Sequence, residues 1–155
     1  MHITINPAIS LKDPISSKLG IRIIEGSIDL LDAIGFEAFT FRKLAQHIGS
    51  TEASIYRYFE SKHKLLLYLT CWYWGWTDYR LVLAISNIED PCDRLNRAIN
   101  VLTAPIEQDD RFAYINEEKL NRIVIAESSK VYLTREVDSE NEVGVYGVFK
   151  QIVER

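Results

Sequence analysis

Hydroxyl, cationic and small side chains gather in one short stretch of the sequence, residues 40–62. Lysine and arginine neutralise phosphate groups, and the hydroxyls of threonine, serine and tyrosine hydrogen-bond to phosphate oxygens. Small residues such as Ala53 and Ser54 would let a short helix come close to base edges in a major groove. The residue types in this stretch therefore indicate contact with a nucleic-acid duplex.

The charge of the chain is unevenly distributed. The 155 residues carry a formal net charge of -4, but residues 40–64 hold five Lys or Arg against two Glu, whereas residues 66–155 hold ten basic against fifteen acidic side chains. Binding to phosphates requires a local positive excess on one face rather than a positive total. The acidic average does not exclude nucleic acid as a partner, because the small positive pole coincides with the candidate stretch.

Two helices are predicted before and within this stretch. Apolar residues recur at helical spacing from Ser17 to Ile34, and Gly35 would end this first helix in a left-handed conformation. Thr40 is a suitable cap for a second helix of only two turns, FRKLAQHI, which Gly49 ends.

A third short helix follows almost at once. Thr51 caps the segment EASIYRYFE, in which Ile55 and Phe59 lie one turn apart and would face inward. A link as short as residues 49–51 forces two short amphipathic helices to cross steeply, as in a helix-turn-helix. We expect the N-terminal end and outer face of the third helix to expose Glu52, Ala53, Ser54, Arg57 and Tyr58.

The rest of the sequence also reads as helical, without a strand pattern or a repeat. Further helices are predicted from Ser61 to about Ser86 with Gly75 as a weak point, from Asp90 and Pro91 to Pro105, from about Asn116, and after a capping box at Ser139 to Glu142. We therefore expect an all-α protein with a three-helix DNA-binding head, residues 1–62, and a helical ligand-binding and dimerisation domain, residues 63–155.

The segment TFRKLAQHIGSTEASIYRYFESKHKLL resembles the signature of the tetracycline-repressor-like (TetR) regulators, and the resemblance covers roughly residues 18–67. It implies a homodimeric transcriptional regulator that binds a double-stranded DNA operator, with half-sites about 34 Å apart, and that responds to a small-molecule effector. The DNA-binding positions that it implies are Thr40, Arg42, Thr51, Glu52, Ala53, Ser54, Tyr56, Arg57, Tyr58 and Lys62, of which Tyr56 and Lys62 would hold phosphates.

Some of these positions have other interpretations. Ile48 and Ser50 depart from the small residues that many relatives carry around the glycine of the turn, so the turn can pack differently. Glu52 can accept a hydrogen bond from the cytosine N4 amino group, but it also repels phosphate. Tyr56 is expected to pack its ring and point its hydroxyl outward. Lys62 can be an ordinary solvated residue at a helix start, although a cation there opposes the helix dipole.

Five aromatic residues lie close together on the predicted fourth helix, at positions 72, 73, 74, 76 and 79. They cannot all face one way on a helix, so core packing is the favoured interpretation. Trp72, Trp76 and Tyr79 are the candidates for lining an effector pocket.

Other classes of function have little support. The three histidines show no metal-binding spacing, Cys71 and Cys92 have no CxxC partner, and no nucleophile or acid–base pair can be named, so we expect neither a metal, a cofactor nor an enzyme. No apolar run is long enough to cross a bilayer and no secretory signal is recognisable, which makes the cytoplasm the expected location.

The end of the chain poses a question about assembly. TetR-like proteins usually continue into two long C-terminal helices that pair across the dimer, whereas this sequence ends at Arg155. Either the chain is truncated or its dimer contact is unusual, and we expect the final helix to expose an apolar stripe of Val143, Tyr146, Phe149 and Val153 to another chain. The alternative function is a helical ligand-binding or protein-interaction module that has lost DNA binding.

Overall fold

The computed structural model describes residues 2–155, and within them every regular element is a helix, which confirms the all-α prediction. The α-helices are α1 (Lys18–Ala38), α2 (Phe41–Ile48), α3 (Glu52–Tyr56), α4 (Lys62–Ile85), α5 (Pro91–Thr103), α6 (Glu117–Glu127), α7 (Ser129–Tyr132), α8 (Val137–Glu142) and α9 (Gly147–Glu154). Short 3-10 helices occupy Pro14–Ser16 and Asp110–Phe112. None of the helices in residues 2–155 is long and apolar enough to cross a bilayer.

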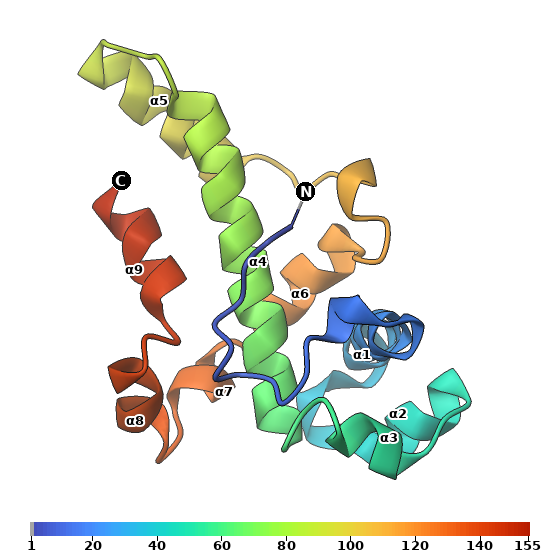
Figure 1. Ribbon diagram of the computed structural model, residues 1–155. Helices are drawn as coiled ribbons and strands as arrows, with labels where there is room; N and C mark the ends of the chain where they lie inside the picture. The colour runs from blue at the N-terminus through green and yellow to red at the C-terminus, as the bar shows by residue number, and fades with distance from the viewer. Residues whose placement is uncertain (1) are drawn as a thin grey trace.

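The helices are arranged around α4, which runs through the middle of the molecule (Figure 1). The head, which we define as α1 to α3, lies at the N-terminal end of α4, and α6 packs against α1. On the other side α9 lies along α4, while α5 folds back against the far end of α4. The arm, residues 2–13, runs along α4 before the chain enters the head.

The position of α4 follows from its sequence. Every residue from Leu65 to Tyr73 is buried, and a helix that is apolar on all sides can only be stable when other elements cover it all round. One continuous core therefore joins head and body, from Ile23 and Phe59 to Trp72 and Val124. The predicted domain boundary at residue 62 falls at the first residue of α4 and stays a prediction.

The predicted helix starts are confirmed by their caps. In each case the side-chain oxygen of the capping residue accepts a hydrogen bond from the backbone N–H three residues further on. The residues that cap in this way are Thr40, Thr51, Ser61, Asp90 and Asn116. Each cap satisfies a backbone donor that has no partner within its helix.

Of the three predicted glycine interruptions, the one at Gly49 is confirmed, and those at Gly35 and Gly75 differ from the expectation. Gly35 has φ 75° and ψ 167°, which kinks α1 instead of ending it, and one further turn continues to Ala38. At Gly75 there is no break, and α4 stays helical through this residue. A Cβ atom at Gly75 would lie 2.6 Å from Cγ2 of Ile3, so the glycine provides the space in which the arm packs on α4.

The predicted capping box at Ser139 is wrong. Ser139 lies inside α8, where its hydroxyl donates to the carbonyl of Glu136 at 2.9 Å, and α8 ends before Gly144, whose φ is 79°. The last helix starts only at Gly147, because the positive φ of Gly144 interrupts the helical path. Of the predicted stripe, Val143, Phe149 and Val153 are exposed, but Tyr146 is only 7% exposed and faces inward.

Candidate nucleic-acid interface

The turn between α2 and α3 depends on a glycine in a left-handed conformation. Gly49 has φ 64° and ψ 48°, and the N–H of Ser50 donates to the carbonyl of Ala45 at 2.8 Å. This C-terminal stop satisfies carbonyls of α2 and reverses the chain at once, since Thr51 already caps α3. The two helices and their tight turn form the predicted helix-turn-helix.

Helix α1 packs against the inner side of the turn. A Cβ atom on Gly26 would lie 2.3 Å from Cγ2 of Ile48, so only a glycine lets α1 pass this close to the end of α2. Leu44, Ile55 and Phe59 have no exposed surface and fill the space between the three helices of the head. The inward-facing role predicted for Ile55 and Phe59 is confirmed, and their packing fixes the angle at which α3 lies on the head.

Most of the predicted DNA-binding residues are exposed at the surface of the head. Ser54 is half-buried, and the side chains that are exposed are those of Thr40, Arg42, Thr51, Glu52, Ala53, Tyr56 and Arg57. They come from the first turn of α2 and from α3, so the helix-turn-helix brings together two segments that the turn separates.

The prediction that Tyr58 lies on the outer face is wrong. Its side chain is 3% exposed, and its hydroxyl shares a hydrogen bond of 2.7 Å with the hydroxyl of Ser17. The reason is that α3 ends at Tyr56, earlier than its sequence pattern indicates, and the following turn directs residue 58 toward the start of α1. Tyr58 therefore supports the head instead of facing a ligand.

The hydroxyls on this face have defined partners. Thr40 Oγ1 accepts from the N–H of Lys43 at 3.2 Å, which leaves its own O–H free to donate to a phosphate oxygen. Thr51 Oγ1 accepts from the N–H of Ser54 at 3.2 Å and shares a hydrogen bond of 2.8 Å with the Ser54 hydroxyl. Between them Thr51 and Ser54 retain one O–H proton for an outside acceptor.

Tyr56 combines packing with exposure, as predicted. Its ring meets that of Phe41 edge to face with 4.9 Å between the ring centroids, and the residue remains 49% exposed. The contact fixes the ring without burying the side chain. The tyrosine is thus held between α2 and α3.

Two arginines provide the uncommitted positive charge of this face. Arg42 and Arg57 are exposed, and no hydrogen bond or ion pair of their side chains occurs within residues 2–155. A guanidinium group without an internal partner is free to bind phosphate or the edge of a guanine. Arg42 at the start of α2 and Arg57 at the end of α3 flank the exposed surface.

The lysines of the same region are engaged within the protein. Lys62 Nζ donates to the carbonyls of Phe36 at 3.0 Å and Phe39 at 3.2 Å, and it stands 4.5 Å from the centroid of the Phe36 ring. Lys64 Nζ pairs with Glu140 Oε1 at 3.0 Å. This geometry favours a structural role for Lys62 at the end of α1 over the phosphate contact that the sequence suggests.

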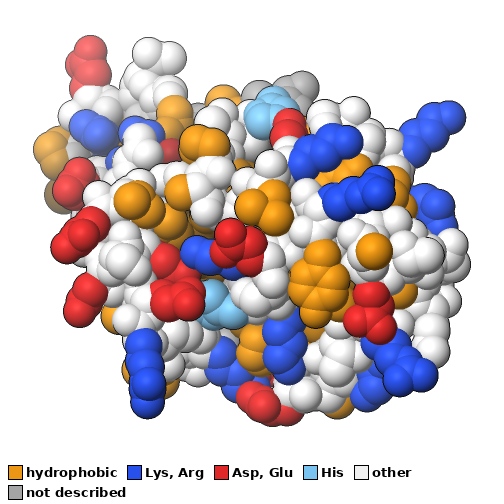
Figure 2. All heavy atoms as spheres, turned by 60° about the horizontal axis from the view of Figure 1, so that its bottom comes forward, with side chains coloured by type: hydrophobic (Ala, Val, Ile, Leu, Met, Phe, Trp, Pro, Cys, Tyr) orange, Lys and Arg blue, Asp and Glu red, His pale blue; other side chains and the backbone are white. Residues whose placement is uncertain are grey.

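Basic and acidic side chains are also distributed unevenly over the surface of the molecule. Seen from the head end, Lys and Arg side chains spread over the side of the molecule where α1 to α3 lie, and Asp and Glu side chains gather on the opposite side (Figure 2). An electric field of this kind orients the head toward a polyanion, although the chain as a whole is acidic.

The arm adds a cation that sequence reasoning missed. The N–H of Leu11 donates to the carbonyl of Tyr58 at 2.8 Å, and the ammonium group of Lys12 stands 5.2 Å from the centroid of the Tyr58 ring. Lys12 is therefore placed beside the end of α3. The arm has no helical periodicity, so nothing in its local pattern predicts this placement.

The structure separates Tyr79 from the other two predicted pocket residues on α4, Trp72 and Trp76. Trp72 and Trp76 are each 1% exposed and stack with 6.2 Å between ring centroids, so they belong to the core, which was the favoured interpretation. Tyr79 instead lines a cavity of about 480 Å³ between the arm, α4 and α9, together with Cys71, Gly75 and Asp78.

Comparison with known proteins identifies the head. Residues 23–69 match the family model described as bacterial regulatory proteins, tetR family. No curated protein matches the chain, and no solved structure does. The matched segment runs from the middle of α1 through the helix-turn-helix into the first part of α4, and it contains the exposed face described above. The head is that of a DNA-binding helix-turn-helix regulator of transcription, and over residues 23–69 it is similar to the tetR family.

Proposed function

We propose that the protein is a sequence-specific, ligand-responsive repressor that binds its operator as a homodimer. The observation that carries the proposal is the exposed face of α2 and α3, on which Arg42 and Arg57 have no internal partner within residues 2–155. On a duplex, Thr40, Arg42 and Tyr56 would contact phosphates, while Thr51 to Ser54 and Arg57 would lie at the base edges.

The proposal is tested by selecting bound sequences from a random duplex library and measuring affinities for the selected operator. Arg57→Ala should reduce the difference in binding free energy between the operator and a random duplex by about 1–3 kcal/mol, because it removes a base contact. Arg42→Ala should weaken all duplexes alike. Arg97→Ala is the matched control, since Arg97 is exposed on α5 and its only charged partner within residues 2–155 is Asp93.

The outcomes distinguish the two functions considered. Enrichment of one sequence, with affinity that falls steeply as salt rises, supports the regulator. A protein that binds no duplex even at low ionic strength would be the alternative, a helical interaction module that has lost DNA binding. Equal effects of Arg57→Ala and Arg97→Ala would also contradict the proposed interface.

Two helices offer surfaces for the homodimer. Neither α5 nor α9 has a buried residue, and α5 exposes Leu95, Ile99 and Leu102 at the spacing of one helix face. On α9 the exposed apolar residues are Phe149 and Val153, the latter 74% exposed. Exposed apolar faces of this kind are typical of protein contacts. We propose that α9, as the sequence suggests, pairs with a second copy.

Sedimentation of two variants tests this contact. Val153→Asp should shift the protein toward monomer because it places a charge in the proposed interface, whereas Ile99→Asp on α5 should not. The reverse pattern would move the dimer contact to α5. A wild-type protein that stays monomeric at high concentration would remove the homodimer from the proposal.

The cavity beside Tyr79 is the proposed effector site. Its volume of about 480 Å³ suits a small molecule, and it is lined by three segments that are distant in the sequence, the arm, α4 and α9. An effector would release DNA only if it binds the DNA-free conformation more tightly than the DNA-bound one. Filling the cavity with Val148→Trp should abolish the response to any compound that releases the operator, while operator binding itself persists.

A further inference from the structure

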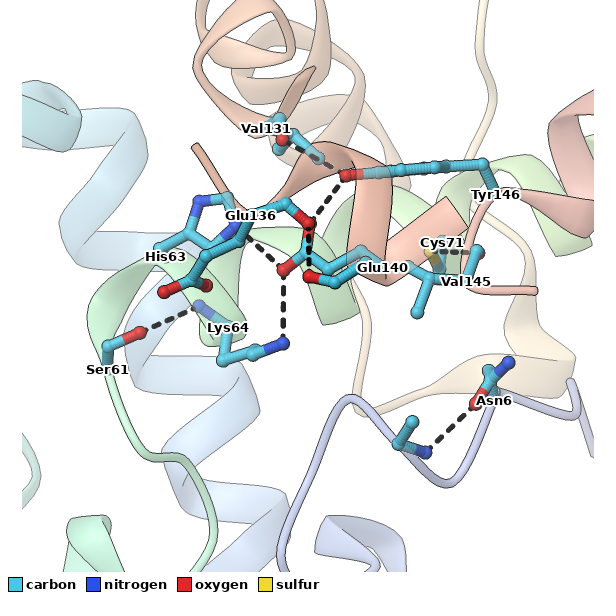
Figure 3. Close-up of polar contacts among 12 residues, drawn as sticks. Asn6, Ser61, His63, Lys64, Cys71, Val131, Glu136, Glu140, Val145 and Tyr146 are labelled. Carbon is cyan, nitrogen blue, oxygen red and sulfur yellow. Dashed lines mark hydrogen bonds and ion pairs between the residues drawn. The ribbon is translucent and has the colours of Figure 1, made fainter. Parts of the chain in front are cut away.

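A histidine and two carboxylates converge where the first turn of α4 meets α8. One possible ligand atom from each of His63, Glu136 and Glu140 lies within 4.8 Å of the other two. Figure 3 shows the imidazole of His63 next to the Glu140 carboxylate, with the Glu136 side chain nearby, although His63 comes from a distant part of the sequence. The predicted absence of a metal rested on the spacing of histidines along the chain, and such spacing cannot detect a ligand set assembled in this way.

The distances are close to those of a metal centre. Two ligands of a tetrahedral zinc ion lie about 3.4 Å apart when the metal–ligand bonds measure about 2.1 Å. His63 Nε2 and Glu140 Oε1 are 3.2 Å apart, which already meets this requirement. The Glu136 side chain is exposed, and its carboxylate has no hydrogen bond or ion pair within residues 2–155, so it can move closer by the ångström required.

The central carboxylate is oriented as metal ligands usually are. Glu140 is 3% exposed, and its second oxygen, Oε2, accepts a hydrogen bond of 2.6 Å from the hydroxyl of Tyr146. An outer hydrogen bond of this kind fixes the direction in which the other oxygen points. Both oxygens of the Glu140 carboxylate are thus held in place, Oε2 by the hydroxyl of Tyr146 and Oε1 by the ammonium group of Lys64.

Lys64 is a built-in competitor for the same oxygen. Its ammonium group lies 3.0 Å from Glu140 Oε1, the atom that also faces His63 (Figure 3). Within residues 2–155 Lys64 forms an ion pair with Glu140 but not with Glu136, so the charge of the Glu136 carboxylate is left unpaired. The Lys64 side chain is long and partly exposed, so its ammonium group can swing into solvent when a divalent ion arrives.

We propose that His63, Glu136 and Glu140 bind a divalent transition-metal ion of the zinc class. Imidazole nitrogen with two carboxylates suits Zn²⁺ and its neighbours in the transition series, whereas Mg²⁺ and Ca²⁺ prefer sites made of oxygen alone. Water would complete the coordination on the exposed side. The ion would tie α8 to the first turn of α4, directly after the head.

The test uses the full chain in a Cys92→Ser background, which removes an exposed thiol that could bind metal elsewhere. After treatment with a chelator, the protein is titrated with Zn²⁺ in a calorimeter, and then with Mg²⁺. We expect one saturable Zn²⁺ site per chain and no response to Mg²⁺. Glu136→Gln should weaken Zn²⁺ binding by at least about tenfold. The matched control Glu142→Gln, which alters an equally exposed glutamate at the other end of α8, should not change it.

Lys64→Met separates a metal site from a purely structural ion pair. If the metal binds here, loss of the competing cation should tighten Zn²⁺ binding by about tenfold or more, even with water-like screening of the two charges. The stability of the metal-free variant is recorded in parallel, so that a folding defect is recognised. No saturable Zn²⁺ binding, binding that Glu136→Gln leaves unchanged, or binding that Lys64→Met fails to tighten would each overturn the proposal.

Discussion

Replacement of Lys62 by methionine decides whether this residue supports the head or contacts DNA. Methionine keeps most of the apolar stem but removes the ammonium group that donates to the carbonyls of Phe36 at 3.0 Å and Phe39 at 3.2 Å. These carbonyls end α1, and Phe39 itself is fully buried. The substitution thus leaves two backbone acceptors without their charged partner at the point where α1, α2 and α4 meet.

The magnitude follows from those two bonds. A hydrogen bond from a charged donor contributes about 1.5–3 kcal/mol when buried. Lys62 is half-buried and water can replace part of each bond, so we expect a total loss of about 2 kcal/mol in the free energy of unfolding. For a chain of this size the midpoint of thermal unfolding should fall by about 6 °C.

The assay combines urea unfolding with the salt dependence of operator binding. Lys18→Met is the matched control, since Lys18 is exposed and its ammonium group has no partner within residues 2–155. Lys62→Met should lose stability while the slope of log affinity against log salt is unchanged below its unfolding range. Unchanged stability together with a slope smaller by about 0.9 would show a phosphate contact and refute the structural role.

Three further predictions concern packing and buried charge. Gly26→Ala should cost about 1–3 kcal/mol in urea unfolding, because the new Cβ would lie 2.3 Å from Ile48 Cγ2; a change below 0.5 kcal/mol would contradict this packing. Burial raises the pKa of Glu117, so its carboxyl group costs stability as pH rises above the ordinary value of 4.5. Glu117→Gln should therefore stabilise the protein by about 1 kcal/mol at neutral pH and by nothing well below pH 4.5, whereas a pH-independent effect would exclude this cause. Gly75→Ala should displace Ile3 from α4, since the new Cβ would lie 2.6 Å from Cγ2 of Ile3, and the displaced arm should become sensitive to protease. An arm that stays protected would show that the contact between α4 and the arm tolerates the methyl group.

Much of the head was predictable because its signals are local. Thr40 and Thr51 cap helices through bonds to residues three positions away, and Gly49 adopts a positive φ that few other residues tolerate. These features depend on neighbours in the sequence, so the pattern alone locates the helix-turn-helix. The outer face of α3 follows from the same pattern as far as Arg57.

The predictions from sequence are wrong for residues whose position is set by contacts with distant segments of the chain. Tyr58 has helical spacing with the exposed residues, but its hydroxyl bonds to Ser17 and its carbonyl accepts from the N–H of Leu11, which holds it at the start of α1. The sequence around Lys62 indicates a solvated cation, because it does not reveal that the carbonyl of Phe36 at the end of α1 accepts a hydrogen bond from its ammonium group. No periodicity within α4 indicates the partners that bury it.

The same limit applies to the C-terminal part. Ser139 to Glu142 has the composition of a capping box, yet Glu140 is drawn into the interior by Lys64 and Tyr146, and this contact places the segment inside α8. Contacts of this range cannot be derived from one sequence by local rules. The proposed metal site escaped prediction for the same reason.

The most direct test of the central claim is a map of backbone amide shifts during titration with the selected operator duplex. For a chain of 17.9 kDa such spectra resolve single residues. The largest shifts should fall on residues 40–57, on α2 and α3, and should vanish as salt is raised. Shifts confined to α5 or α9, or none at all at low salt, would contradict the assignment of this face to DNA.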